Sequence, residues 1–117
     1  MQKTLKLNQN YLFQRMYRSG KSVVSSTVVL YYHKRPRQKL NRIGITTTKK
    51  IGCAVRRNRA RRVILESYRL LEPMVAPGYT FVVVARSKAA DVKMQTVGDD
   101  LRRLLSKIGA LQPQQNV

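Results

Sequence analysis

The chain has 117 residues, which is enough for one domain with a modest hydrophobic core and too short for two. Hydrophobic residues make up an ordinary 43%, but 24 Lys and Arg stand against 5 Asp and Glu, giving a net charge of +19. Repulsion on that scale destabilises a compact state, so the charge predicts a polyanionic partner. It argues against a membrane surface, because the basic residues are not gathered on one lysine-rich amphipathic helix.

The first predicted element is a helix near the N-terminus. Asn8 suits its N-cap and Gly20 its end. Between them, apolar side chains recur at helical spacing, at Leu12, Phe13, Met16 and Tyr17. We expect Leu12 and Met16 to be core residues.

A β-rich stretch follows this helix. Residues 28–32 and 42–48 are rich in β-branched and aromatic residues and predict two strands. Residues 34–41 carry a proline and four basic residues and predict an exposed loop between the strands. The region around 22–26 leaves room for a short additional strand.

The second half of the chain predicts helix, strand and helix. A long helix begins at Ala54 or Val55, ends at Leu71 and is closed by Pro73. The strand over 80–86 is a continuous apolar run, which is typical of a strand covered on both faces. The last helix is amphipathic, and its apolar positions are Met94, Val97, Leu101, Leu104, Leu105 and Ile108. Gly98 weakens that helix by about 1 kcal/mol relative to Ala.

These elements predict an α+β two-layer fold in a single domain over residues 1–117. The order is α-β-β-(β)-α-β-α, with about four strands in a mixed sheet and three helices. We expect the tail over 110–117 to be disordered, because it is mostly polar. The chain carries one cysteine, Cys53, and neither a signal peptide nor a membrane-spanning run, so we expect a cytoplasmic protein. Cys53 itself should be a small buried residue at the junction before the long helix.

Basic residues crowd the start of the long helix. A helical wheel places Ala60, Val63, Ile64, Ser67, Tyr68, Leu70 and Leu71 on one arc, which should be buried. The opposite arc carries Asn58, Arg59, Arg61, Arg62, Glu66 and Arg69, with Arg57 at its border and Leu65 unexplained by any core. Charged helix faces are usually only solvated, but they normally mix signs, and Glu66 is the one acid here. An arginine face of this kind suits phosphate oxygens and stacking on bases.

The string over 49–62, Lys-Lys-Ile-Gly-Cys-Ala-Val-Arg-Arg-Asn-Arg-Ala-Arg-Arg, resembles the signature of the bacterial ribonuclease P protein family. Its core is the Arg-Asn-Arg triplet at 57–59. The similarity covers roughly residues 7 to 108, including the β-rich block before the string and the Phe-Val-Val-Val-Ala-Arg strand after it.

The resemblance implies a protein that pairs with a large catalytic RNA and helps to remove the 5′ leader of precursor tRNA. It implies that the RNA and its bound Mg²⁺ ions do the chemistry, and that neither a membrane nor a protein partner is required. It also implies an uncommon left-handed crossover through the arginine helix, where right-handed crossovers dominate in general. The implied contacts with the catalytic RNA are Lys49, Lys50, Arg56, Arg57, Asn58, Arg59, Arg61 and Arg62. The implied leader cleft, between the first helix and the sheet, is lined by Phe13, Tyr17, Tyr31, Thr46 and Thr48.

The aromatic residues have two readings. Helical spacing alone would make Phe13 and Tyr17 core residues, whereas the resemblance places them partly exposed in the cleft, where bases can stack on them. Tyr31 and Tyr32 point to opposite faces of their strand, so only one can line the cleft, and we choose Tyr31.

The acidic residues argue for a non-catalytic protein. The five carboxylates, Glu66, Glu72, Asp91, Asp99 and Asp100, form no clustered site for two-metal phosphoryl chemistry. Asp99 and Asp100 diverge by about 100° on a helix and are better explained as acids near a helix N-terminus. His33 is the single histidine, which excludes an imidazole pair.

Three positions depart from the family pattern. Leu65 stands where the family often has arginine, and Tyr17 replaces a common phenylalanine and adds a hydroxyl. The strand end is rich in hydroxyls, with Thr46, Thr47 and Thr48, and which of them touches the leader stays open.

Two other functions also stay open: a structural RNA binder such as a small ribosomal protein, and a ribonuclease that acts without RNA.

Overall fold

A computed structural model of the chain describes residues 4–6, 10–35 and 37–112. Asn8, Pro36 and residues 113–117 lie outside this part, as do the side chains of residues 10–12 and 19. The N-cap expected at Asn8 and the core position expected for Leu12 are therefore untested. Met16 is buried, as predicted.

The sheet is mixed and has five strands in the order β1-β4-β5-β3-β2. The pairs β1–β4 and β4–β5 are parallel, whereas β5–β3 and β3–β2 are antiparallel. The strands are β1 (Thr4–Lys6), β2 (Lys21–Val24), β3 (Val28–Lys34), β4 (Asn41–Thr46) and β5 (Tyr79–Ala85). The predicted α+β class is confirmed. The strand count is one higher than expected, because β1 is only three residues long and pairs with a strand far along the chain.

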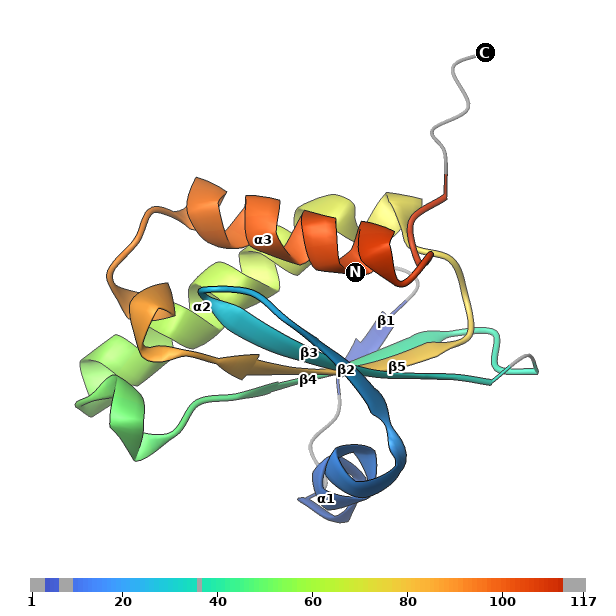
Figure 1. Ribbon diagram of the computed structural model, residues 1–117, viewed down its shortest axis with the longest axis horizontal. Helices are drawn as coiled ribbons and strands as arrows, with labels where there is room; N and C mark the ends of the chain where they lie inside the picture. The colour runs from blue at the N-terminus through green and yellow to red at the C-terminus, as the bar shows by residue number, and fades with distance from the viewer. Residues whose placement is uncertain (1–3, 7–9, 36, 113–117) are drawn as a thin grey trace.

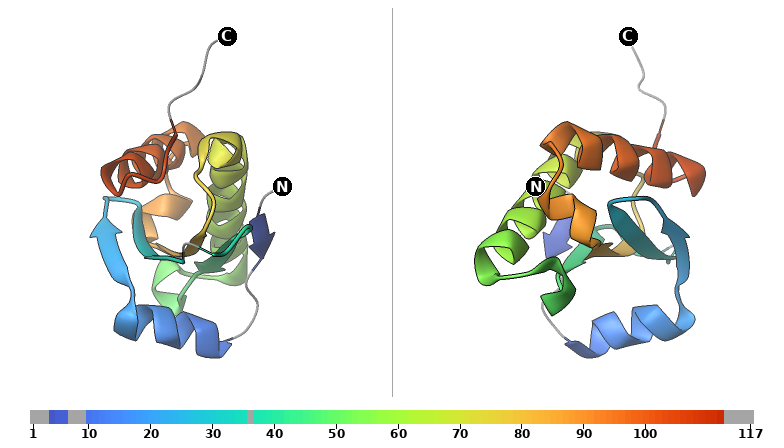
Figure 2. Two further views of the ribbon diagram at one scale, coloured as in Figure 1. Left: turned by 90° about the vertical axis from the view of Figure 1, so that its right-hand side faces the viewer. Right: turned by 60° about the vertical axis from the view of Figure 1, so that its left-hand side comes forward.

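Two helices cover one face of the sheet and one helix lies on the other (Figures 1 and 2). Helices α2 (Ala54–Leu71) and α3 (Met94–Lys107) pack side by side on the first face, and α1 (Asn10–Ser19) lies on the second. Three short 3₁₀ helices connect the elements: η1 (Lys49–Ile51), η2 (Glu72–Met74) and η3 (Ser87–Ala90). The chain from β4 through α2 to β5 joins two parallel neighbours, and its left-handed sense stays a prediction.

The main core lies between the sheet and the α2–α3 pair. β5 is buried at five of its seven positions, which confirms a strand covered on both faces. Tyr68 of α2 sits edge-on to Phe81 of β5 and shares a 2.9 Å hydrogen bond with Thr4, so the short β1 is attached to α2 through a buried hydroxyl. This contact places the edge of the sheet beside the arginine helix.

The carboxylate of Asp100 joins α3 to the β2–β3 turn. Its Oδ2 accepts hydrogen bonds from Thr27 Oγ1 at 2.6 Å and Ser26 Oγ at 3.2 Å, and its Oδ1 pairs with Arg103 at 2.9 Å. Asp99 and Asp100 lie beyond the first turn of α3, so the expectation of acids at a helix N-terminus is wrong. Asp100 is instead a buried link between layers, a role that needs partners distant in sequence.

Several boundaries and burial assignments differ from the prediction. The second predicted strand ends at Thr46 and not at Thr48, because the chain turns into η1 directly after Thr48. Leu70 was placed on the buried arc but is 62% exposed. Residues 110–112 are not part of a disordered tail as expected: Ala110 is buried and Gln112 N–H donates to the Met74 carbonyl, which pairs 110–112 with the chain at the end of η2. Residues 113–117 lie outside the described part of the chain.

Candidate nucleic-acid interface

Helix α2 separates an apolar face from a basic face. The buried residues are those of the predicted apolar arc apart from Leu70: Ala60, Val63, Ile64, Ser67, Tyr68 and Leu71. Asn58, Arg59, Arg61 and Arg62 are exposed on the other side. Lys49 and Lys50, on η1 just before the helix, are exposed as well, so the positive end of the helix dipole and the side-chain charges lie together. We call Lys49, Lys50, Arg57, Asn58, Arg59 and Arg62 the arginine surface.

The basic side chains of this region are not equally available. Arg57, Asn58 and Arg62 make no side-chain hydrogen bond or ion pair within the described part of the chain. Arg59 Nε donates to the Ala90 carbonyl at 3.2 Å and its Nη2 donates to the Val92 carbonyl at 3.5 Å, so its guanidinium is partly engaged within the protein. Arg56 is the exception, because its two terminal nitrogens contact both Asp91 oxygens at 2.5 and 3.0 Å. Its implied role as an RNA contact is therefore the least supported by geometry.

Three ionisable groups at the start of α2 influence one another. The hydrogen bond from Arg56 holds the pKa of Asp91 below its usual range, and the same bond raises the pKa of Arg56. The backbone N–H of Arg56 lowers the pKa of the Cys53 thiol. Cys53 is exposed and not buried as expected, because it occupies the N-cap position, outside the helix and away from the core. The region therefore keeps both its carboxylate and its arginine charged at neutral pH.

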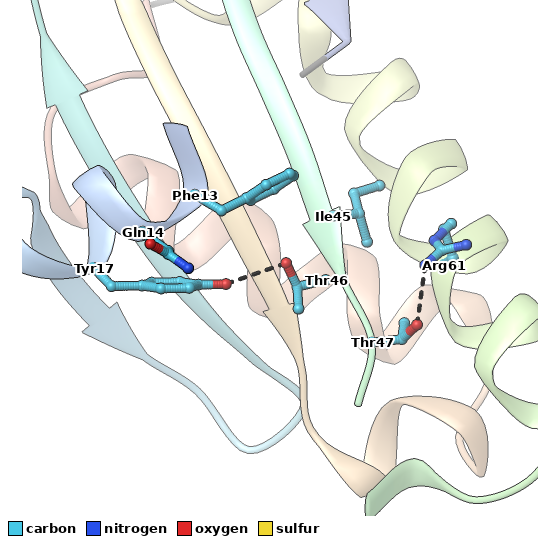
Figure 3. Close-up of a pocket in the computed structure, with 7 residues that line it drawn as sticks. All are labelled: Phe13, Gln14, Tyr17, Ile45, Thr46, Thr47 and Arg61. Carbon is cyan, nitrogen blue, oxygen red and sulfur yellow. Dashed lines mark hydrogen bonds between the residues drawn. The ribbon is translucent and has the colours of Figure 1, made fainter. Parts of the chain in front are cut away.

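A groove runs between α1, the end of β4 and α2 (Figure 3). Its outer part has a volume of about 420 Å³, with an aromatic wall from α1 and an arginine wall from α2. The lining residues are Phe13, Gln14, Tyr17, Ile45, Thr46, Thr47 and Arg61. An adjoining, more apolar part of about 290 Å³ shares three of these residues and adds Lys6, Ile43 and Leu65. We call the two parts together the groove.

The predicted cleft residues fall into three groups. Phe13, Tyr17 and Thr46 line the groove, and the Tyr17 hydroxyl donates to Thr46 Oγ1 at 3.2 Å. Tyr31 is on the α1 face of the sheet, with its ring centroid 4.9 Å from that of Tyr17, so it supports the aromatic wall without lining the groove. Thr48 is exposed and lies outside the groove.

Sequence reasoning identified some groove residues only in part. Thr47, one of the three threonines between which the choice stayed open, lines the groove and accepts a 3.2 Å hydrogen bond from Arg61 Nη2. Arg61 also lines the groove but was assigned to the catalytic-RNA face alone. Leu65, which no core explained, packs at the apolar end of the groove beside Ile43 and Ile45. The helical wheel contained the information for Arg61 and Leu65, because positions 61 and 65 are one turn apart and lie on the same face of the helix.

No group of three or more histidine, cysteine or acidic side chains gathers among the described residues to hold a metal ion. Within the same part of the chain, no helix is both long and apolar enough to cross a bilayer. What the surface offers is a set of guanidinium and ammonium groups beside a narrow groove with an aromatic wall. Such a combination suits a nucleic-acid strand, with phosphates on the cations and bases on the rings.

The chain is similar to known proteins in sequence and in fold. The model of the Ribonuclease P family matches residues 1–109. The chain is 38% identical over 105 residues to the ribonuclease P protein component of Thermoanaerobacter sp. strain X514, covering 90% of each sequence. It is 40% identical over 106 residues to the corresponding component of Caldanaerobacter subterraneus, covering 91% of this chain and 90% of that one.

Solved structures show the same fold. The RNase P protein of Staphylococcus aureus superposes with a TM-score of 0.81 at 28% identity, over 92% of this chain and 97% of that one. The RNase P protein of Thermotoga maritima gives a TM-score of 0.77 at 28% identity, over 88% and 96%.

Proposed function

Because the chain belongs to the ribonuclease P protein family and is a protein subunit for tRNA processing, we propose that it binds two RNA elements on two adjacent surfaces. The arginine surface binds the catalytic RNA, and the groove holds the 5′ leader of precursor tRNA. Removal of the leader is carried out by Mg²⁺ ions bound mainly to the RNA subunit. The chain needs no further protein partner and works in the cytoplasm.

The observation that carries this proposal is the position of the groove beside the arginine surface. Phe13 and Tyr17 form one wall and Arg61 the other, so a single strand could stack its bases on the rings while its phosphates face the guanidinium. A ribosomal-type structural RNA binder would account for the charge and not for an aromatic groove open to solvent. The juxtaposition favours a site that receives a separate, single-stranded RNA.

The arginine surface suits a folded RNA. Arg57, Asn58 and Arg62 project from one side of a helix whose other side is fixed by the core, so their spacing is rigid. Arginine forks can donate two parallel hydrogen bonds to a phosphate, and an asparagine amide can reach a base edge or a ribose. Binding should weaken steeply with salt, since a protein with about 6–10 phosphate contacts loses roughly 10³–10⁵ in affinity between about 50 and 200 mM salt.

Most of the acidic residues are paired or buried within the protein, which supports the assignment of the cleavage chemistry to the RNA subunit. Asp91 and Glu66 are paired with arginines, and Asp100 is buried against Thr27. Glu72 is buried and Asp99 is exposed on α3. A two-metal hydrolytic site needs several carboxylates aimed at ions about 3.5–4 Å apart, and these five are dispersed over the molecule.

Reconstitution tests the proposal. Purified chain added to a transcribed bacterial ribonuclease P RNA should restore cleavage of precursor tRNA at low Mg²⁺, where the RNA alone is slow. Stimulation that requires the 5′ leader to be several nucleotides long would support the groove assignment. Absence of stimulation would favour the structural RNA binder, and cleavage at the mature 5′ end by the chain without RNA would favour a stand-alone ribonuclease.

A further inference from the structure

The segment 87–92 contains η3 and the start of the connection to α3. It forms hydrogen bonds with η1 and with the start of α2, the two elements that carry the arginine surface. Asp91 accepts two hydrogen bonds from the Arg56 guanidinium. Ser87 Oγ donates to the Lys50 carbonyl at 3.3 Å, and the Ala90 carbonyl accepts from Arg59 Nε. One short segment thus contacts η1 and two successive turns of α2, the elements that carry the arginine surface.

Arg56 links three elements through one side chain. Its Nε donates to the Ile51 carbonyl at 2.8 Å, while its terminal nitrogens hold Asp91, so its guanidinium lies between η1 and the 87–92 segment. Gly52 allows this route: its φ is +126°, and a Cβ there would lie 3.0 Å from Arg56 Cδ and Nε. The Arg56 side chain therefore passes directly over the Gly52 backbone.

The start of α2 lacks the usual stabilising features of a helix N-terminus. Its N-cap residue, Cys53, makes no side-chain capping hydrogen bond, although such bonds typically contribute about 1 kcal/mol. Its first turn carries no acidic residue, and five of its first nine residues are arginines that repel one another. The Arg56–Asp91 pair supplies what the first turn lacks: a negative charge near the helix N-terminus and two hydrogen bonds that hold the turn in place.

We propose that Asp91 is a positioning residue for RNA binding, and that Arg56 does not bind phosphate. Arg56 and Asp91 together form what we call the strap, the hydrogen-bonded pair that connects η1 and the first turn of α2 to the segment 87–92. This inference rests on the proposed function of the arginine surface. The strap sets the direction of the first turn of α2, and with it the spacing between Lys49 and Lys50 on η1 and the Arg57-Asn58-Arg59 triplet. An exposed ion pair contributes little to global stability, so its main consequence is local geometry.

The proposal predicts that Asp91→Asn changes RNA affinity in the direction opposite to that expected from charge alone. Replacing Asp91 with Asn removes a negative charge beside an RNA-binding surface, which by charge alone should tighten binding. Loss of the strap should instead weaken binding of a transcribed bacterial ribonuclease P RNA by at least about fivefold, the lower end of ordinary coupling between two sites. Asp99→Asn is the matched control, because it removes one exposed acid whose side chain makes no hydrogen bond or ion pair in the described part of the chain.

A double-mutant cycle separates the strap from a direct contact. If Arg56 acts through the strap, Arg56→Gln and Asp91→Asn each weaken binding, and the double variant is no weaker than the worse single variant. If Arg56 binds phosphate directly, Arg56→Gln weakens binding while Asp91→Asn tightens it, and that pattern overturns the proposal. Unchanged affinity in both single variants overturns it as well.

Amide hydrogen exchange of the protein without RNA provides an independent readout. In Asp91→Asn, the amides over 51–59 should exchange faster than in the wild type or in Asp99→Asn, with the β5 amides unchanged. Exchange over 51–59 at the wild-type rate would refute the strap whatever the RNA result. Failure of the wild-type protein to bind the RNA would refute the proposed function, and the exchange data would still decide whether the strap exists.

Discussion

Arg61 Nη2 donates a hydrogen bond to Thr47 Oγ1 at 3.2 Å, which connects the outer face of α2 to the residue that follows β4. Arg61 therefore forms the wall between the groove and the arginine surface. Its neighbour Arg62 points from the same helix without contacting the groove. The two adjacent arginines provide a way to separate the two proposed RNA sites.

Arg61→Ala should weaken binding of both RNAs, whereas Arg62→Ala should weaken binding of the catalytic RNA alone. Each lost phosphate contact should lower the slope of log affinity against log salt by about 1. The measurement is a salt titration of two equilibria: protein with the catalytic RNA, and holoenzyme with precursor tRNA carrying or lacking the leader. An equal loss of leader affinity in both variants would contradict the separation.

Phe13→Ala should reduce the affinity of the holoenzyme for leader-bearing precursor tRNA, because base stacking on an aromatic ring is worth about 1–3 kcal/mol. Assembly with the catalytic RNA should be unaffected, since Phe13 lies on α1, across the groove from α2. Tyr17→Phe is the matched control: it keeps the ring and its contact with Tyr31, and loses only the hydrogen bond to Thr46. If Tyr17→Phe costs as much as Phe13→Ala, the hydroxyl rather than stacking dominates the site.

The stability of the fold should decrease in acid partly through Asp100. Burial raises the pKa of this carboxyl, but hydrogen bonds from Thr27 and Ser26 and the charge of Arg103 outweigh it, so the pKa lies below its ordinary value. A depressed folded-state pKa gives stability that is complete above the unfolded pKa of about 3.9 and lost as the pH falls through the folded pKa. Urea unfolding between pH 7 and pH 2.5 should show this loss in the wild type and in Asp99→Asn, and a flatter profile in Asp100→Asn.

Gly98→Ala should stabilise the protein by about 0.5–1 kcal/mol, because Gly is a poor helix former and α3 has space for a methyl group at this position. A Cβ on Gly98 would lie 3.6 Å from Ser67 Oγ and 3.8 Å from its Cβ, which are ordinary contact distances. Thermal or urea unfolding measures the change. A decrease in stability would mean that α2 and α3 must approach more closely here than the ordinary contact distances imply.

The elements with strong local patterns were predictable from the sequence. Helix α2 has the predicted end at Leu71, because a long 3.6-residue periodicity runs directly into Pro73. The basic arc of this helix also followed from periodicity and residue type. Tyr31 was chosen over Tyr32 to line the cleft; it lies on the α1 face against Tyr17, whereas Tyr32 packs toward the main core, but Tyr31 does not line the groove.

The remaining features depend on contacts between residues distant in sequence. Strand β1 has three residues and acquires its place from pairing with β4 and from the Thr4–Tyr68 hydrogen bond. The partners of Arg56 and Asp100 lie 35 and 73 residues away. A helical wheel shows that an arginine faces outward, but it cannot show that the arginine is paired with an aspartate from a distant segment.

The short pairing between β1 and β4 has one more consequence. β1 covers Asn41 to Ile43, so the outer backbone edge of Gly44 to Thr46 has no strand beside it in the described part of the chain. An exposed strand edge of this kind invites pairing with another polypeptide and hence aggregation. Phe13 on one side and Arg61 on the other narrow the approach to this edge, and the arginine adds a charge that a second highly basic copy would meet with repulsion. We therefore expect the walls that shape the groove to hinder self-association through this strand edge as well.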